Sequence, residues 1–254
     1  MTLQDFIFDL PLYTKVKVSD NHILDELCSD VHIDGYNPNK GVYSTFCLKY
    51  SVRSENLFGN HVVELVFTCQ RYGDSIYVLI HFDLDEGYIE KVGQYPSVAD
   101  IHIGQVKKYK KVLGDSYIHD FTRAIGLAAN GIGTGSFVYL RRVFEHLVSE
   151  IGDVVIKKGE VTREQFESSK MENKIKLLSS YLPEVVTENK ALYGVLSAGI
   201  HTLSEDDCLK YFSVVRDVIE LILDEQEYAW QKEEKRKNAR NKLSSIAGEI
   251  KGVR

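Results

Sequence analysis

The chain has 254 residues, of which 44% are hydrophobic and 27% are charged, and its four cysteines are widely scattered. These proportions are those of a globular protein, and they exclude a disordered or fibrous chain and a disulfide-rich secreted domain. The net charge of −6 disfavours nucleic-acid binding by long-range electrostatics. No apolar run approaches the roughly 18 residues that span a bilayer, and the amino terminus lacks the basic start of a signal peptide, so we expect a cytoplasmic location.

The first hundred residues have the alternating pattern of β-strands, rich in β-branched and aromatic side chains. Strands are predicted over residues 12–18, 44–52, 61–68 and 75–82. A short turn-forming segment separates the last two, which predicts an antiparallel hairpin. Residues 34–41 contain Gly, Pro and Asn and are predicted to form a loop, and the sheet is expected to end near Pro96.

Beyond residue 98 the periodicity becomes helical. One or two helices are predicted for residues 98–130, with an interruption near Gly114. The Asn and Gly residues of segment 130–135 are interpreted as the C-cap that ends this helical segment. The next helix begins at Ser136 and has an apolar stripe. The stripe consists of Phe137, Leu140, Phe144, Leu147 and Val148.

Three further helices are predicted. The first begins with a capping box at Thr162 and continues to about Tyr181, where Pro183 stops it. A short helix near residues 187–199 ends at Gly199. The last helix has an N-cap at Ser204 and acids in its first turn, and it continues through Leu223 or as far as Ser245.

Together the elements predict an α+β fold, with an antiparallel sheet of four or five strands followed by a bundle of about five helices. We divide the chain into a β-rich domain (1–100), a helical bundle (101–231) and a basic helical tail (232–254). The tail has eight Lys or Arg against three Glu, a net charge of +5, so the other residues sum to −11.

Two cysteines have the spacing of zinc knuckles in which the second cysteine is a tyrosine. They begin the segments Cys47–Tyr50 and Cys69–Tyr72. Structural zinc needs four thiolate or imidazole ligands, and no spacing requires Cys28 and His32 to complete such a set. Buried free thiols are therefore favoured over bound metal. The segment is interpreted as a degenerate zinc-ribbon-like hairpin, with no metal and no other cofactor expected.

Two other segments have the residue types of anion-binding sites. A cluster of four lysines around one aromatic ring is a candidate nucleic-acid site, with a solvated helical face as the alternative. It consists of Lys107, Lys108, Tyr109, Lys110 and Lys111. The glycine-rich turn at residues 131–135 precedes a helix N-terminus, where amides can hold a phosphate. It lacks the Lys-Ser/Thr ending of a P-loop, so a helix–helix connection is favoured.

The order of elements from about residue 135 to 225 resembles the HEPN superfamily of helical-bundle domains. The resemblance is carried by Tyr139–Glu145, Met171–Leu178 and Leu192–Cys208. It implies a helical bundle that often dimerises, in prokaryotic toxin–antitoxin, antiviral or RNA-processing settings. Some related bacterial proteins place a zinc-ribbon-like segment before such a bundle.

Active HEPN ribonucleases pair an Arg with a His four to six residues later, at the junction that His201 would occupy. Residues 194–196 read Gly-Val-Leu, so this arginine is missing. Arg141 and His146 have the spacing, but they lie on another helix and point about 140° apart. Catalysis would need Arg141 or Arg142 to reach His201 across the bundle or a dimer interface, as the cation beside an acid–base group.

The sequence therefore favours a non-catalytic recognition or dimerisation module of a bacterial defence or toxin-type system. Its expected partner is a second copy, another protein or RNA. The alternative is a metal-independent ribonuclease that uses His201 with Arg141 or Arg142. A nucleotide sensor at the glycine-rich turn is the third hypothesis.

Overall fold

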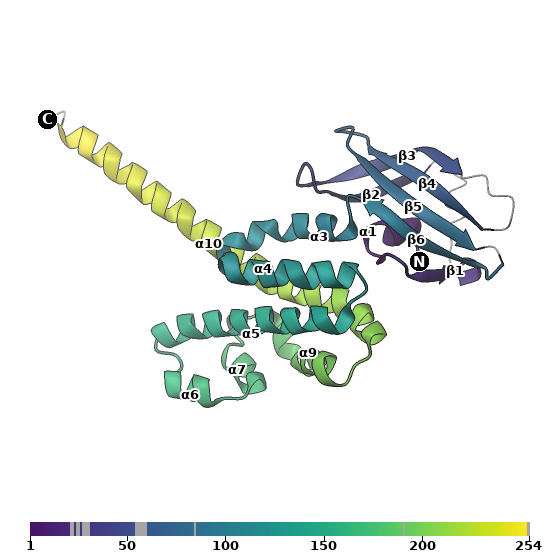
Figure 1. The fold of residues 1–254 in the computed structure, drawn as a ribbon. Helices are drawn as coiled ribbons and strands as arrows, with labels where there is room; N and C mark the ends of the chain where they lie inside the picture. The colour runs from purple at the N-terminus through teal and green to yellow at the C-terminus, as the bar shows by residue number, and fades with distance from the viewer. Residues whose placement is uncertain are drawn as a thin grey trace. The chain divides into compact units, whose positions relative to one another are not determined.

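The structure is a computed structural model that describes residues 1–20, 23, 26, 31–53, 60–83, 85–189 and 191–252. It has the predicted α+β fold, in which a curled antiparallel sheet is followed along the chain by a helical region (Figure 1). The sheet has six strands, where four or five were predicted. Within the described ranges, each helix is too short or too polar to span a bilayer.

The strands are ordered β1-β6-β5-β4-β3-β2 across the sheet, and all neighbours are antiparallel. They are β1 (Lys15–Lys17), β2 (His32–Asn37), β3 (Val42–Arg53), β4 (Asn60–Cys69), β5 (Ser75–Asp83) and β6 (Tyr88–Tyr95). The predicted hairpin is confirmed, because β4 pairs with β5 from Asn60 opposite Asp83 to Thr68 opposite Ser75. The predicted first strand is shortened to β1.

The helices precede and follow the sheet. They are α1 (Leu3–Phe8), α3 (Val98–Val106), α4 (Lys110–Ala129), α5 (Gly133–Lys157), α6 (Arg163–Ser168), α7 (Met171–Leu177), α8 (Glu184–Glu188), α9 (Ala191–His201) and α10 (Glu205–Gly252), with 3-10 turns η1 (Val18–Asp20) and η2 (Lys107–Tyr109). The predicted interruption near Gly114 is confirmed, since this residue has a φ of 69° inside α4.

The chain divides into two compact units. The first contains residues 1–108, 121–139 and 199–212, and the second contains residues 109–120, 140–198 and 213–254. Helices α4, α5, α9 and α10 each contribute residues to both units. Each unit therefore combines segments that are far apart in the sequence.

The core of the first unit lies on one face of the sheet, where α1 packs against the strands. Phe6 and Ile7 of α1 are fully buried together with Phe46, Phe67 and Ile80. The helix begins with a capping box in which Thr2 accepts from the amide of Asp5. A helix of six residues is too short to be stable alone, so this packing holds it in place.

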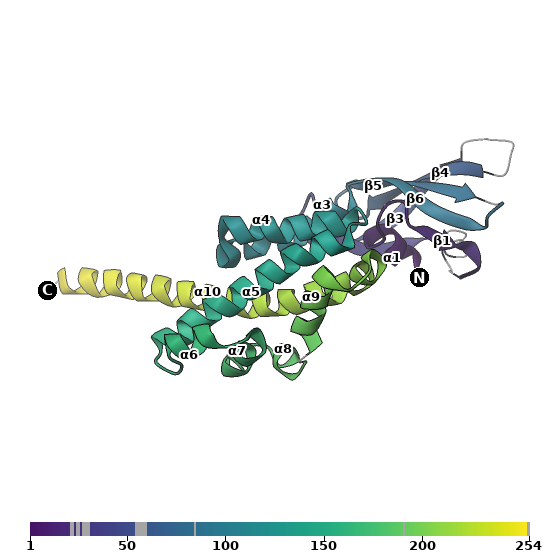
Figure 2. The same ribbon diagram turned by 60° about the horizontal axis from the view of Figure 1, so that its bottom comes forward.

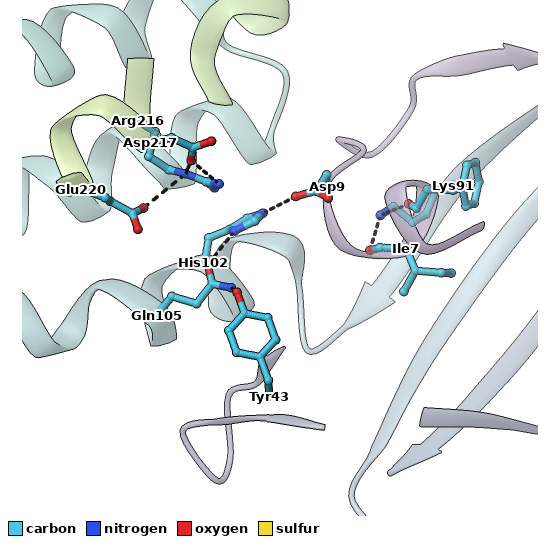
Figure 3. A network of polar contacts seen from close by, with 10 residues as sticks. Ile7, Asp9, Tyr43, Lys91, His102, Gln105, Arg216, Asp217 and Glu220 are labelled. Carbon is cyan, nitrogen blue, oxygen red and sulfur yellow. Dashed lines mark hydrogen bonds and ion pairs between the residues drawn. The ribbon is translucent and has the colours of Figure 1, made fainter. Parts of the chain in front are cut away.

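Lys91 of β6 fixes the other end of α1. Its fully buried Nζ donates to the carbonyl oxygens of Phe6 at 2.9 Å and Ile7 at 3.1 Å (Figure 3). Carbonyls at the C-terminal end of a helix have no intrahelical partner, so the amine supplies one. Burial lowers the pKa of Lys91 to about 7.

The predicted loop at residues 34–41 is wrong over its first half, which forms part of β2. The strand alternates exposed and buried residues and pairs with β3. Gly35 allows the Phe8 ring to approach the strand backbone and does not form a turn, because a Cβ on this residue would overlap the ring. Only residues 38–41 turn, and Gly41 there has a φ of 71°.

The predicted helix from Thr162 to about Tyr181 is divided into α6 and α7. Its N-cap is confirmed, since Thr162 accepts from the amide of Gln165. Ser168 and Ser169 donate to carbonyls of the preceding turn, and Ser169 is extended, so the first helix ends there. The predicted helix end at Gly199 is also wrong, because α9 continues to His201.

Within the second unit, α5 and α10 each have one buried face. Four of the five residues of the predicted stripe of α5 lie in this unit, and all five are buried. The buried residues that α10 contributes to this unit are Val215, Ile219, Ile222 and Leu223. Beyond Leu223 the helix continues to Gly252 as one element (Figure 2).

Candidate functional site

The two candidate arginines have carboxylate partners within the second unit. Arg141 Nε donates to Glu145 at 2.8 Å, and its Nη2 donates to the hydroxyl of Tyr193 at 3.0 Å. Arg142 lies 3.3 Å from Asp120. These partners compete with any phosphate for the guanidinium groups, so neither cation is presented to RNA without displacing a carboxylate.

The two candidate histidines have different surroundings. His201 is exposed at the end of α9 and belongs to the first unit, so its pairing with either arginine stays a prediction. His146 stacks on Tyr117 with 3.5 Å between the ring centres, and burial lowers its pKa. Both residues of the pair Arg141 and His146 therefore have other partners, because Arg141 pairs with Glu145 and His146 stacks on Tyr117.

The lysine cluster does not form the predicted platform around an aromatic ring. Tyr109 is fully buried, and its hydroxyl donates to Asp224 at 2.8 Å, so its ring is not accessible to a base. Lys110 lies 3.0 Å from Asp115, and Lys111 lies over the Trp230 ring. Lys107 and Lys108 are exposed on η2. The prediction of Tyr109 as a base-stacking residue is therefore corrected.

The glycine-rich turn binds a carboxylate of the chain itself. The amides of Gly133 and Thr134 at the start of α5 donate to Glu205 Oε2, the latter at 2.9 Å. These hydrogen bonds, led by that from Thr134, lower the pKa of Glu205. A phosphate would have to displace this carboxylate, which supports the interpretation of the turn as a helix–helix connection.

The cysteines of the two degenerate knuckles do not converge. In the ladder Phe46 lies opposite Cys69 and Cys47 lies opposite Thr68, and side chains of neighbouring residues in a strand point to opposite faces. Cys28 lies outside the described residues. Among the described side chains, no three His, Cys, Asp or Glu residues form a group suited to a metal ion.

A polar chain in the first unit connects the C-cap residue of α1 with α3 and β3 (Figure 3). Asp9 Oδ1 lies 3.3 Å from His102 Nε2, and His102 Nδ1 lies 3.2 Å from Gln105 Oε1. The amide of Gln105 then donates to the hydroxyl of Tyr43 at 2.9 Å. Both ring nitrogens of the buried His102 have partners, so this chain orients structural elements and does not present a free base.

Helix α10 continues beyond the core as an accessible surface. Its last buried side chain is Leu223, and from Asp224 to Ile246 no side chain is buried. Isolated helices are only marginally stable in water, and local pairs add only a few tenths of a kcal/mol each. Two such pairs are Glu233–Arg236 at 3.8 Å and Glu234–Lys237 at 3.2 Å.

Apolar residues recur on one side of α10, which we call the outward face. They are Val214, Val218, Leu221, Tyr228, Ala239, Leu243 and Ile246. At 3.6 residues per turn they fall within about 80° of one another and about 130° from the buried stripe. Val214 is 62% exposed, Leu221 47% and Leu243 66%, so the face is open to solvent.

The outward face was missed in the sequence because it lies on a helix that already has a buried stripe. The sequence predicts the last helix through Leu223 or as far as Ser245, and the charged residues 232–242 hide an apolar pattern in its second half. The steps of seven from Val214 to Leu221 and from Leu221 to Tyr228 were the available signal, since heptad spacing marks a helix that packs on another helix.

Comparison of the chain with protein-family models, with curated proteins and with solved structures finds no match.

Proposed function

We propose that the protein is a cytoplasmic, non-catalytic recognition module that binds a protein partner through the outward face of α10. The observation that carries the proposal is a row of exposed apolar residues on one side of a helix that continues beyond the core, with two heptad steps between Val214 and Tyr228. Solvent-exposed apolar patches of this kind mark sites of protein association. A helix packed on another helix is the usual way to cover such a stripe.

The absence of catalysis is supported by the surroundings of the candidate ribonuclease residues. Arg141 and Arg142 are each bound to a carboxylate, and the arginine that normally precedes the histidine is missing. The setting in a bacterial defence or toxin-type system rests on the resemblance of residues 135–225 to the HEPN superfamily.

The proposal is tested by site-specific photo-crosslinking in cells. A benzophenone side chain placed at Leu221 lies on the outward face, whereas one placed at Gln231 lies about 60° beyond the edge of that face on the same helix. We expect a protein adduct of defined mass from position 221, lost on adding Leu243→Glu, and none from position 231. Adducts with RNA alone, or equal adducts from both positions, contradict the proposal.

A further inference from the structure

The charges of α10 are divided along its length. Residues 214–231 contain five acids and one base, a net charge of −4, and residues 232–246 contain six bases and two acids, a net charge of +4. The helix dipole favours cations only in the last turn, so it does not account for cations that begin at Lys232, five turns earlier. A second helix of the same sequence in the opposite direction would match both halves.

We propose that the outward face of α10 binds the same face of α10 in a second copy of this chain, antiparallel, with the twofold axis between Tyr228 and Lys232. This inference rests on the proposed recognition function and names its partner. The segment from Val214 to Ile246 is roughly 48 Å long and covers more than four heptads, enough for a stable helix pair.

The antiparallel alignment brings complementary residues together on the same side of the pair. Apolar residues of one copy face apolar residues of the other at Val214–Ile246, Val218–Leu243 and Leu221–Ala239. Acids face bases at Asp217–Lys242, Asp224–Lys235 and Glu225–Arg236. Each pair occurs twice, because a twofold interface is self-complementary. At the centre, Tyr228 meets Lys232, a cation–π combination.

Other occupants fit the face less well. In a parallel pair each residue would meet its own copy, so Glu225 would face Glu225 and Arg236 would face Arg236. A nucleic acid or an anionic membrane would be attracted to residues 232–246 and repelled by residues 214–231, which would leave Val214 and Leu221 exposed to water. Only a partner with both charges in the reverse order covers the whole face.

Charge reversal in the full-length chain tests the pairing, with mass measured by sedimentation equilibrium against the 28.9 kDa monomer. We expect Glu225→Lys or Arg236→Glu alone to weaken the wild-type dimer by about tenfold or more, because both symmetric pairs become repulsive. The double variant should restore the dimer. An equimolar mixture of the two single variants should form a heterodimer.

The matched controls are Glu227→Lys and Lys237→Glu, which make the same changes of charge on other sides of the helix. Lys237→Glu also breaks the pair with Glu234, as Arg236→Glu breaks the pair with Glu233. Both controls should leave the dimer unchanged. A monomeric wild type, or one that associates only with added RNA or anionic vesicles, overturns self-pairing. Protein adducts from Leu221 in a monomeric protein would still support recognition of another protein.

Discussion

At the residue scale, Lys91 couples the fold of the first unit to pH. The folded chain releases the Lys91 proton near pH 7, whereas the unfolded chain keeps it until about 10.5, the ordinary pKa of lysine. Between these values the unfolded state binds more protons, so the free energy of unfolding should increase with pH by up to about 1.4 kcal/mol per unit. Below pH 7 both states hold the proton, so the destabilising effect of burying the charged amine is fully present and no longer changes with pH.

Denaturant unfolding of wild type and Lys91→Met at pH 7, 8 and 9 measures this effect. The difference between the two proteins removes the contribution of groups that both contain. Wild type should become more stable relative to the variant across this range. Parallel pH profiles would show that the Lys91 side chain reaches water or keeps its charge when folded.

Substitution by alanine should have opposite effects on stability at two of the glycines. Gly35→Ala should cost about 1–3 kcal/mol of unfolding free energy, because the new methyl would overlap the Phe8 ring. Gly126→Ala should stabilise by about 0.5–1 kcal/mol, because Gly126 lies within α4 with nothing within 4 Å of its Cβ position. Thermal unfolding of both variants measures the contrast, and a neutral Gly35→Ala would contradict the close approach.

At the element scale, the exposed end of α10 should contribute little to the stability of the monomer. Truncation after Gln231 removes described side chains of which none is buried. In dilute solution the free energy of unfolding should therefore change by less than about 1 kcal/mol. Urea titrations of both chains check this value. A loss of several kcal/mol would mean that residues 232–252 pack on the body.

The elements that the sequence predicted are those whose pattern is local. Alternation identified β4 and β5, and helical spacing identified the stripe of α5, of which Phe137 and Phe144 are fully buried. The strand β2 was missed because Gly35 suggests a turn until Phe8 is known to cover it. The division between α6 and α7 was missed because Ser168 and Ser169 are compatible with a helix unless they bind its carbonyls.

The candidate site was only partly predictable for a similar reason. The sequence indicated the basic tail and the possible extension of the last helix, but burial decides which of two stripes on α10 faces water. The role of Tyr109 could not be predicted from the sequence for the same reason, since four lysines flank it in the sequence but its hydroxyl donates to the distant Asp224. Partners distant in sequence decide whether a polar cluster is a binding site or part of the core.

At the scale of the whole molecule, the charge distribution predicts that RNA is not the partner. Residues 1–231 have a net charge of −11 and therefore repel a polyanion, whereas only the tail, with a charge of +5, attracts it. Contacts limited to the tail should be lost between 50 and 200 mM salt, as counterion release predicts. Fluorescence anisotropy of labelled single-stranded RNA with the full-length protein should show no saturable binding at the higher salt concentration.

Incubation of total cellular RNA with the protein in EDTA tests for metal-independent ribonuclease activity. The wild-type protein is compared with the variants His201→Ala and Arg141→Ala. We expect no cleavage by any of the three, because Arg141 is engaged by Glu145 and Tyr193 and no arginine precedes His201 on α9. Cleavage by wild type that is lost in both variants would establish a ribonuclease site formed by these residues. In that case the outward face of α10 would serve to assemble an enzyme rather than a recognition module.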